Sequence, residues 1–193
     1  EVRLYHADAG FSEFPDYRFS DKSRHFEPST ETLFDGQTDQ QGNFSFSLNK
    51  IKTEDAPGIL NAVFTTRVFE NGGDFSISSQ SIRYSPYDEY VGIRLPENDD
   101  NWYSTEQPVR LQGVTITPTG KQSGNATIQI EVYKLDWHWW WDSEDENLGS
   151  YVNREYSSSV LSQKVKATDG RFQLDLHIPK YGRYFIRATD PSG

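Results

Sequence analysis

Apolar and polar residues alternate with a period of two in segment after segment of this 193-residue chain. A β-strand with one buried face requires that period, because successive side chains point to opposite faces. No segment shows the apolar spacing of an amphipathic helix. Turn residues such as Asn71-Gly72-Gly73, which tolerate the positive φ of hairpin turns, separate several of the alternating segments. The pattern therefore predicts an all-β fold built from antiparallel hairpins.

The predicted strands follow from this alternation, and the segments between them are predicted loops. In residues 42–48, three apolar side chains (Phe44, Phe46 and Leu48) are expected to point inward. Residues 59–69 have few polar interruptions, so we expect a strand covered on both faces. Residues 7–29 are rich in aromatic residues without a period, which predicts a long loop that packs its rings onto the domain. The predicted strands are residues 1–6, 30–35, 42–48, 59–69, 75–84, 90–95, 109–117, 127–142, 157–167, 172–178 and 184–188.

The segment 127–142 holds four of the five tryptophans, namely Trp137, Trp139, Trp140 and Trp141. They are the candidate packing or ligand-facing aromatic residues. Exposed indole rings could form a sugar-binding platform. The alternative is a packing cluster in the core or between domains, with each ring burying about 150–250 Å². Three consecutive strand residues cannot all face one way, so we favour packing.

Two predicted strands change the phase of their alternation. In 127–142 the apolar residues move to the other face at Tyr133, and in 109–117 they do so at Gly113. A one-residue slip of this kind predicts a β-bulge or, in 127–142, a crossing from one sheet to another.

Composition argues against several classes of function. The net charge of −10 argues against a nucleic-acid partner. The chain contains no cysteine, which excludes a disulfide framework, a thiol nucleophile and a zinc–thiolate site. The four histidines are scattered, and no GxSxG motif is present. We therefore expect no enzymatic activity, no cofactor and no metal site. A carboxylate pair for glycoside hydrolysis stays open, since 29 acidic residues allow many pairings.

A clustered set of carboxylates, residues 142–146 together with Asp99 and Asp100, is a candidate calcium site. It lacks the residue order of a calcium-binding loop. Charge runs of this kind are usually solvated surface, which is the interpretation we prefer.

An internal repeat predicts two domains. Residues 2–5 match 130–133, and residues 42–48 match 170–176, both at an offset of 128. Two matches at one offset favour two homologous sandwiches, which we place at residues 1–88 and 89–193. By this comparison the first domain lacks N-terminal strands and the second lacks its last strand. We therefore expect a segment of a longer multidomain chain. Open sheet edges invite pairing, which predicts a strand-exchange homodimer of the isolated segment.

Three stretches together resemble the bacterial alpha-2-macroglobulin family: VYKLDWHWWW (132–141), GRFQLDLHIPKYGRYFIRATDPSG (170–193) and TTRVFENGGDFSISSQSIRYSPYDEYVGI (65–93). More narrowly, the chain is similar to two consecutive macroglobulin domains upstream of the bait-region domain. The resemblance implies tandem fibronectin-like, antiparallel β-sandwich domains. It also implies a structural scaffold segment of a protease-trapping inhibitor, with no chemistry of its own. The Cys-Gly-Glu-Gln thioester motif and a bait region are absent from these residues, so no functional residue is carried over.

The resemblance also implies partners and a location. The partners are neighbouring domains of the same longer chain and, through the parent protein, target proteases. The location is the periplasm or cell envelope. The alternative function is a carbohydrate-binding or adhesin-type β-sandwich module that uses the Trp137–Trp141 block.

Overall fold

All secondary structure in the described part of the chain is β-structure. The strands form antiparallel sheets, which confirms the all-β prediction. The described residues contain no helix, and therefore none that could cross a membrane. The computed structural model describes residues 1–7, 10–24, 26–46, 51, 53, 55–70, 72–98, 102–135 and 159–190.

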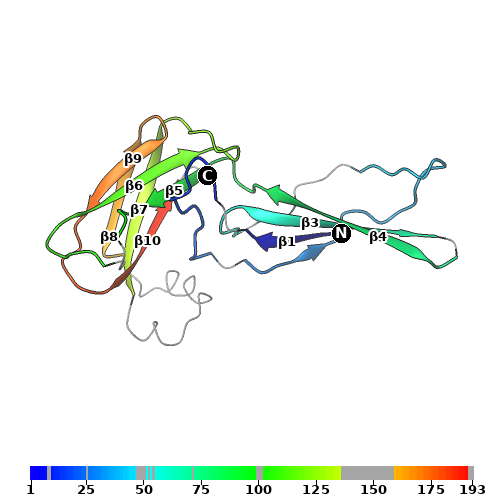
Figure 1. The fold of residues 1–193 in the computed structure, drawn as a ribbon, viewed down its shortest axis with the longest axis horizontal. Coiled ribbons are helices and arrows are strands. Elements are labelled where there is room, and N and C mark those ends of the chain that lie inside the picture. Colours follow the sequence, from blue (N-terminus) through cyan, green and yellow to red (C-terminus); the bar gives the residue numbers. More distant parts are fainter. Residues whose placement is uncertain are drawn as a thin grey trace.

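The N-terminal unit is a single four-stranded sheet in the order β2-β1-β3-β4. Figure 1 shows it at one end of an elongated molecule. The long hairpin of β3 and β4 runs in register from Leu60 opposite Tyr84 to Phe69 opposite Phe75. Gly73, with φ of 92°, forms the predicted turn. The strands are β1 (Val2–His6), β2 (Thr30–Glu31), β3 (Leu60–Phe69) and β4 (Phe75–Tyr84).

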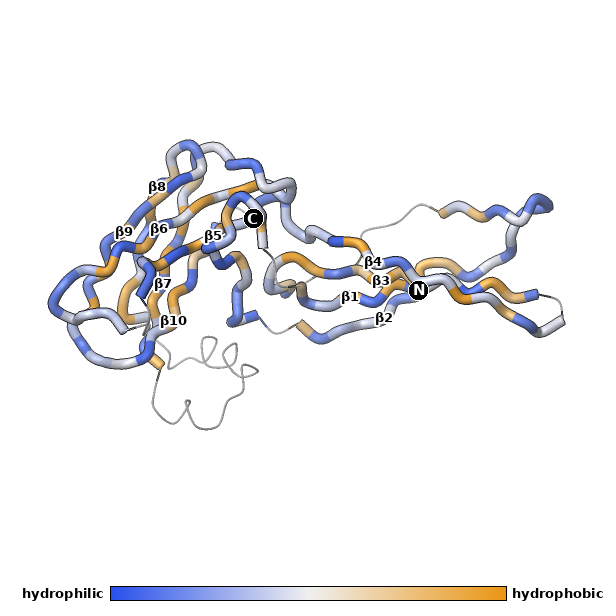
Figure 2. Tube along the Cα trace, viewed as in Figure 1, coloured by the Kyte–Doolittle hydropathy of each residue, from blue (hydrophilic) through white to orange (hydrophobic). Residues whose placement is uncertain are grey.

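The core of the N-terminal unit covers only the half of the sheet that lies nearer the other unit. Val2, Leu4, Leu60 and Ala62 are fully buried there. Toward the hairpin end the apolar side chains are exposed, and Phe69 is 68% exposed. Figure 2 shows hydrophobic residues along this hairpin. The prediction that residues 59–69 are covered on both faces is therefore wrong, because no second layer packs on the outer half of β3 among the described residues.

The predicted strand at 42–48 is also wrong over its described part. Residues 43–46 have no strand structure, and Phe44 and Phe46 are about 40% exposed instead of pointing into a core. Their rings stack with that of Phe34 at 5.5 and 5.8 Å between centroids. The matching segment 171–176 is a strand because it pairs with β6, and no described strand of the N-terminal unit stands in the place of β6.

The C-terminal unit is a sandwich of two three-stranded sheets, with orders β5-β6-β9 and β10-β7-β8. Its core contains Leu111, Ile128, Ile130, Val132 and Phe172, all buried. The predicted alternation of residues 172–178 is confirmed by the burial of Phe172 and Leu176. The strands are β5 (Tyr90–Arg94), β6 (Val109–Ile116), β7 (Ala126–Leu135), β8 (Leu161–Ala167), β9 (Arg171–Leu176) and β10 (Arg183–Thr189).

Both units contain the same arrangement of three strands. In the N-terminal unit β1 lies between β2 and β3, and in the C-terminal unit β7 lies between β8 and β10. Strand β1 corresponds to β7 in the 128-residue repeat of the sequence. The repeat thus has a structural counterpart, while the boundary at residues 88 and 89 stays a prediction.

The two phase changes in the sequence are not bulges. Strand β6 keeps one continuous register with β5 and with β9 through Gly113, and β7 does so with β10 through Tyr133. The apolar residues change phase because both faces of β6 and of β7 are buried. Leu111 points into the sandwich, whereas Val114 and Ile116 belong to a second cluster on the outer face. Tyr133 and Leu135 are likewise buried on the face opposite Val132.

Candidate functional site

The second cluster is formed by a segment of the N-terminal unit that lies on the C-terminal unit. Residues 10–24, here called the docking segment, lie in the connection between β1 and β2. Their side chains Phe11, Phe14 and Phe19 are buried against Tyr90, Val114 and Ile116. The rings of Phe11 and Phe19 meet edge to face at 4.7 Å between centroids, a favoured geometry for aromatic pairs. The rings predicted to pack from residues 7–29 therefore form the junction between the two units.

Gly92 allows the docking segment to approach strand β5. A Cβ atom at this position would overlap the Phe19 ring, so only glycine leaves room for that ring on β5. One residue earlier, Arg18 pairs with Ile93 as in an antiparallel sheet. Arg18 N–H donates to Ile93 O at 2.9 Å, and Ile93 N–H donates to Arg18 O at 3.0 Å. The docking segment thus adds one backbone pair to the free edge of β5.

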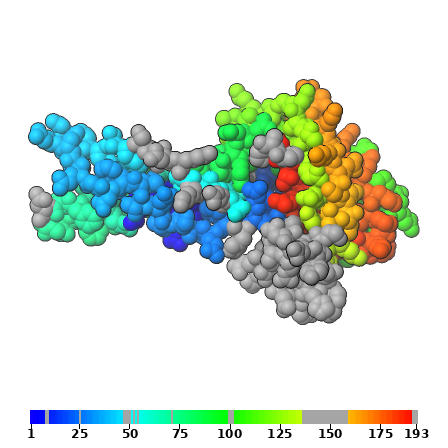
Figure 3. Space-filling view, turned by 180° about the vertical axis from the view of Figure 1, so that it is seen from behind, coloured from blue at the N-terminus to red at the C-terminus, as the bar shows by residue number. Residues whose placement is uncertain are grey.

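Asp21 is bonded to both units. Its backbone N–H donates to Pro57 O, just before β3, at 2.7 Å. Its carboxylate accepts a hydrogen bond from Arg187 Nε on β10 at 2.9 Å. The side chains of Asp21 and Arg187 are 17% and 22% exposed, so water screens this pair only partly. Figure 3 shows the blue atoms of the N-terminal part beside the red atoms of the last strand.

Tyr87 stands in the connection between β4 and β5 and contacts both clusters. Its hydroxyl accepts a hydrogen bond from Arg24 Nη1 at 2.6 Å and donates one to Ala56 O at 2.7 Å. Burial raises the pKa of the Tyr87 hydroxyl above its ordinary value, although the nearby Arg24 guanidinium acts in the opposite direction. Burial likewise raises the pKa of Tyr90. The junction is therefore a packed aromatic contact with a few specific hydrogen bonds.

Replacing Tyr87 with phenylalanine is expected to lower the free energy of unfolding by about 1–3 kcal/mol, because the buried carbonyl of Ala56 loses its donor. Urea denaturation at neutral pH measures the change. Tyr103→Phe is a matched control, since the Tyr103 hydroxyl donates to the Pro96 carbonyl in an exposed loop. Equal losses in the two variants would contradict a structural role for the Tyr87 hydroxyl.

The structure describes few of the residues singled out in the sequence. The candidate aromatic residues Trp137, Trp139, Trp140 and Trp141 fall outside the described residues, as do residues 142–146, Asp99 and Asp100. The packing and sugar-binding interpretations of that block stay predictions. The tryptophan that the structure does describe, Trp102, is 69% exposed in the connection between β5 and β6.

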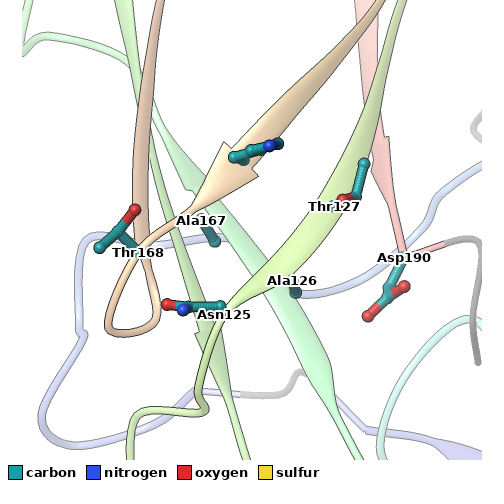
Figure 4. Close-up of a pocket in the computed structure, with 7 residues that line it drawn as sticks. Asn125, Ala126, Thr127, Ala167, Thr168 and Asp190 are labelled. Carbon is teal, nitrogen blue, oxygen red and sulfur yellow. The ribbon is translucent and has the colours of Figure 1, made fainter.

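A depression at one end of the sandwich carries no recognisable site. Asn125, Thr127, Thr168 and Asp190 are among the residues that line it (Figure 4). The Oδ1 atom of Asn125 already accepts the backbone N–H of Asp169 at 3.1 Å. Within the described ranges, no group of three His, Asp or Glu side chains is placed to hold a metal ion.

Sequence reasoning missed the polar partners of the junction. Asp21 and Arg187 are 166 positions apart, and no local pattern links them. Gly92 is a sequence feature that could have indicated the junction, because a glycine inside a strand often marks a close approach of another chain segment. The aromatic content of residues 7–29 predicts a loop that packs its rings, but an aperiodic segment does not indicate which surface it covers.

The fold and the junction define a class: an all-β protein of consecutive units joined through a packed aromatic contact. Family comparison makes this specific. The Bacterial Alpha-2-macroglobulin MG5 domain matches residues 1–76, and Bacterial macroglobulin domain 6 matches residues 92–193. The chain belongs to the bacterial alpha-2-macroglobulin family.

The fold is also found in a solved structure. The crystal structure of trypsin-activated alpha-2-macroglobulin from Escherichia coli is 15% identical with a TM-score of 0.57, and the match covers 98% of this chain and 13% of that chain. The native conformation of the E. coli protein is 17% identical, with coverages of 98% and 12% and a TM-score of 0.46. Salmonella alpha-2-macroglobulin reacted with methylamine is 15% identical, with coverages of 100% and 13% and a TM-score of 0.43. Comparison with curated protein sequences gave no match. The chain thus spans about an eighth of the length of these structures.

Proposed function

We propose that this chain is a structural scaffold segment of a bacterial alpha-2-macroglobulin-like protease-trapping inhibitor, with no chemistry of its own. The observation that carries the proposal is the tandem match of MG5 over residues 1–76 and domain 6 over residues 92–193. Macroglobulin domains are structural domains, and the solved relatives are longer chains that contain such domains as parts. The packed junction supports the proposal, because a scaffold must place its successive domains relative to one another.

The same proposal supplies partners and a location. The partners are neighbouring domains of the longer parent chain, and target proteases meet the segment only through that parent. The location is the periplasm or cell envelope. A strand-exchange homodimer of the isolated segment stays a prediction. It is supported by β4, a ten-residue edge strand whose other edge pairs with no described strand. A monomeric mass in light scattering would count against the dimer.

The test compares the isolated 193-residue chain with its full-length parent. Each is incubated with trypsin, and the remaining cleavage of a large protein substrate and of a small peptide substrate is measured. A trap hinders large substrates more than small ones, so the parent should protect the large substrate selectively. The isolated chain should change neither rate. Inhibition by the isolated chain would give it an activity of its own, and a parent without effect on the large substrate would overturn the trap.

A further inference from the structure

The two units are joined by few elements. No strand of β1–β4 pairs with a strand of β5–β10 in the described part of the chain. The covalent connection from β4 to β5 is short, residues 85–89. The docking segment is the second connection, since it leaves β1, packs on the C-terminal unit and returns to β2. The angle between the units therefore depends on how this segment is held at each of its ends.

The two halves of the docking segment are anchored differently. Residues 10–19 pack on the C-terminal unit through the buried phenylalanines and the backbone pair of Arg18 with Ile93. At their start they also meet the N-terminal unit, where Arg83 at the end of β4 donates to Gly10 O at 3.1 Å and Ile59 is buried in the same cluster. Residues 20–24 lie against the N-terminal unit, where Asp21 N–H donates to Pro57 O and Ser20 lies beside Gly58. A change of angle between the units would bend the segment between these halves, near Phe19 and Ser20.

An ion pair spans this bending point. Asp21 belongs to the half that the N-terminal unit holds, and its carboxylate reaches Arg187 on β10 of the C-terminal unit at 2.9 Å. The carboxylate is kept in place by Ser23, whose N–H and Oγ both donate to Asp21 Oδ1, at 2.9 and 2.5 Å. Arg24 lies 3.6 Å from the other oxygen. The aspartate is thus oriented by its own segment toward a partner on the opposite unit.

We propose that the Asp21–Arg187 pair is a brace across a hinge, and that it selects one angle between the two units. When the pair opens, the units swing about residues 85–89 and the Phe19–Ser20 point. The aromatic half of the docking segment stays on β5, and both sheets stay folded. This inference concerns the conformation of the chain and does not rest on the proposed protease trap.

The experiment measures the distance between the units directly. The chain contains no cysteine, so Ser81→Cys on β4 and Lys164→Cys on β8, both exposed, are the only positions that take a spin label. Pulsed electron spin resonance of the labelled chain should give one narrow distance distribution. Arg187→Glu should abolish that single population and give a broad one, and the exchanged pair Asp21→Arg with Arg187→Asp should restore a narrow one.

A matched control separates the brace from a general effect of charge. Arg110→Glu makes the same charge change on the same unit and breaks the pair of Arg110 with Asp175, which is 2.8 Å long and lies away from the junction. The Arg110→Glu variant should keep a narrow distribution of distances between the two spin labels. Hydrogen exchange of the Ile93 amide, which donates to Arg18 O, should stay slow in Arg187→Glu. A narrow distribution in Arg187→Glu, equal broadening in Arg110→Glu, or fast exchange at Ile93 would each overturn the proposal.

Discussion

Truncation of Phe172 to alanine is expected to lower the free energy of unfolding of the C-terminal unit by about 3–5 kcal/mol. The ring is 6% exposed in the sandwich core. It fills the space beside Gly113, its direct partner on β6, where a Cβ atom would overlap the ring. Removing the ring leaves a cavity between two sheets that the surrounding strands can close only in part. Urea denaturation of the parent and variant chains measures the loss.

Gly113→Ala tests the same contact in a second way, because its effect on the free energy of unfolding should depend on Phe172. In the parent chain the added methyl group overpacks the core and should cost about 1–3 kcal/mol. In the Phe172→Ala background the same methyl group enters the cavity, so it should cost nothing or recover stability. Gly124→Ala, with no atom within 4 Å of the added Cβ, is the control and should change stability by about 0.5 kcal/mol or less. Additive losses at Gly113 and Phe172 would contradict the assigned contact.

This pair of residues also shows where sequence analysis succeeds and where it stops. The alternation of residues 172–178 predicted β9 and its buried face, because period two is a local property of a strand. The phase change at Gly113 predicts a bulge, but it has another cause. It reflects burial of both faces of β6, by Phe172 on one side and by the docking segment on the other. A sequence shows that both faces are apolar, but not which distant segment covers the second face.

The same limit explains the errors in the N-terminal unit. The hairpin of β3 and β4 was predictable, because both strands and their glycine turn are adjacent in sequence. The apolar residues Phe44 and Phe46 alternate as in β9, yet they form no strand there. Alternating apolar and polar residues allow a segment to join a sheet. Whether it becomes a β-strand depends on a partner strand with which it can pair. The same limit applies to the junction. Its aromatic residues can be recognised in the local sequence, whereas the ion pair between two distant residues cannot.

Phe19→Ala is the second variant with a large expected effect, about 3–5 kcal/mol in the free energy of unfolding. Phe19 is 7% exposed, packs edge to face on Phe11 and occupies the space that Gly92 leaves on β5. Its loss opens a cavity at the junction and weakens the cover over Val114 and Ile116. Those side chains lie on the outer face of the sandwich and are buried by the docking segment.

Phe69→Ala is the matched control, because Phe69 has the same chemistry at the end of the β3–β4 hairpin and is 68% exposed. Its truncation should cost about 0.5 kcal/mol or less. Denaturation of both variants under the same conditions compares a buried phenylalanine of the junction with an exposed one of the N-terminal sheet. If the two losses were equal, the docking segment would contribute no packing energy in solution. A large loss for Phe19 alone would make residues 10–19 part of the core of the C-terminal unit, although they belong by sequence to the N-terminal one.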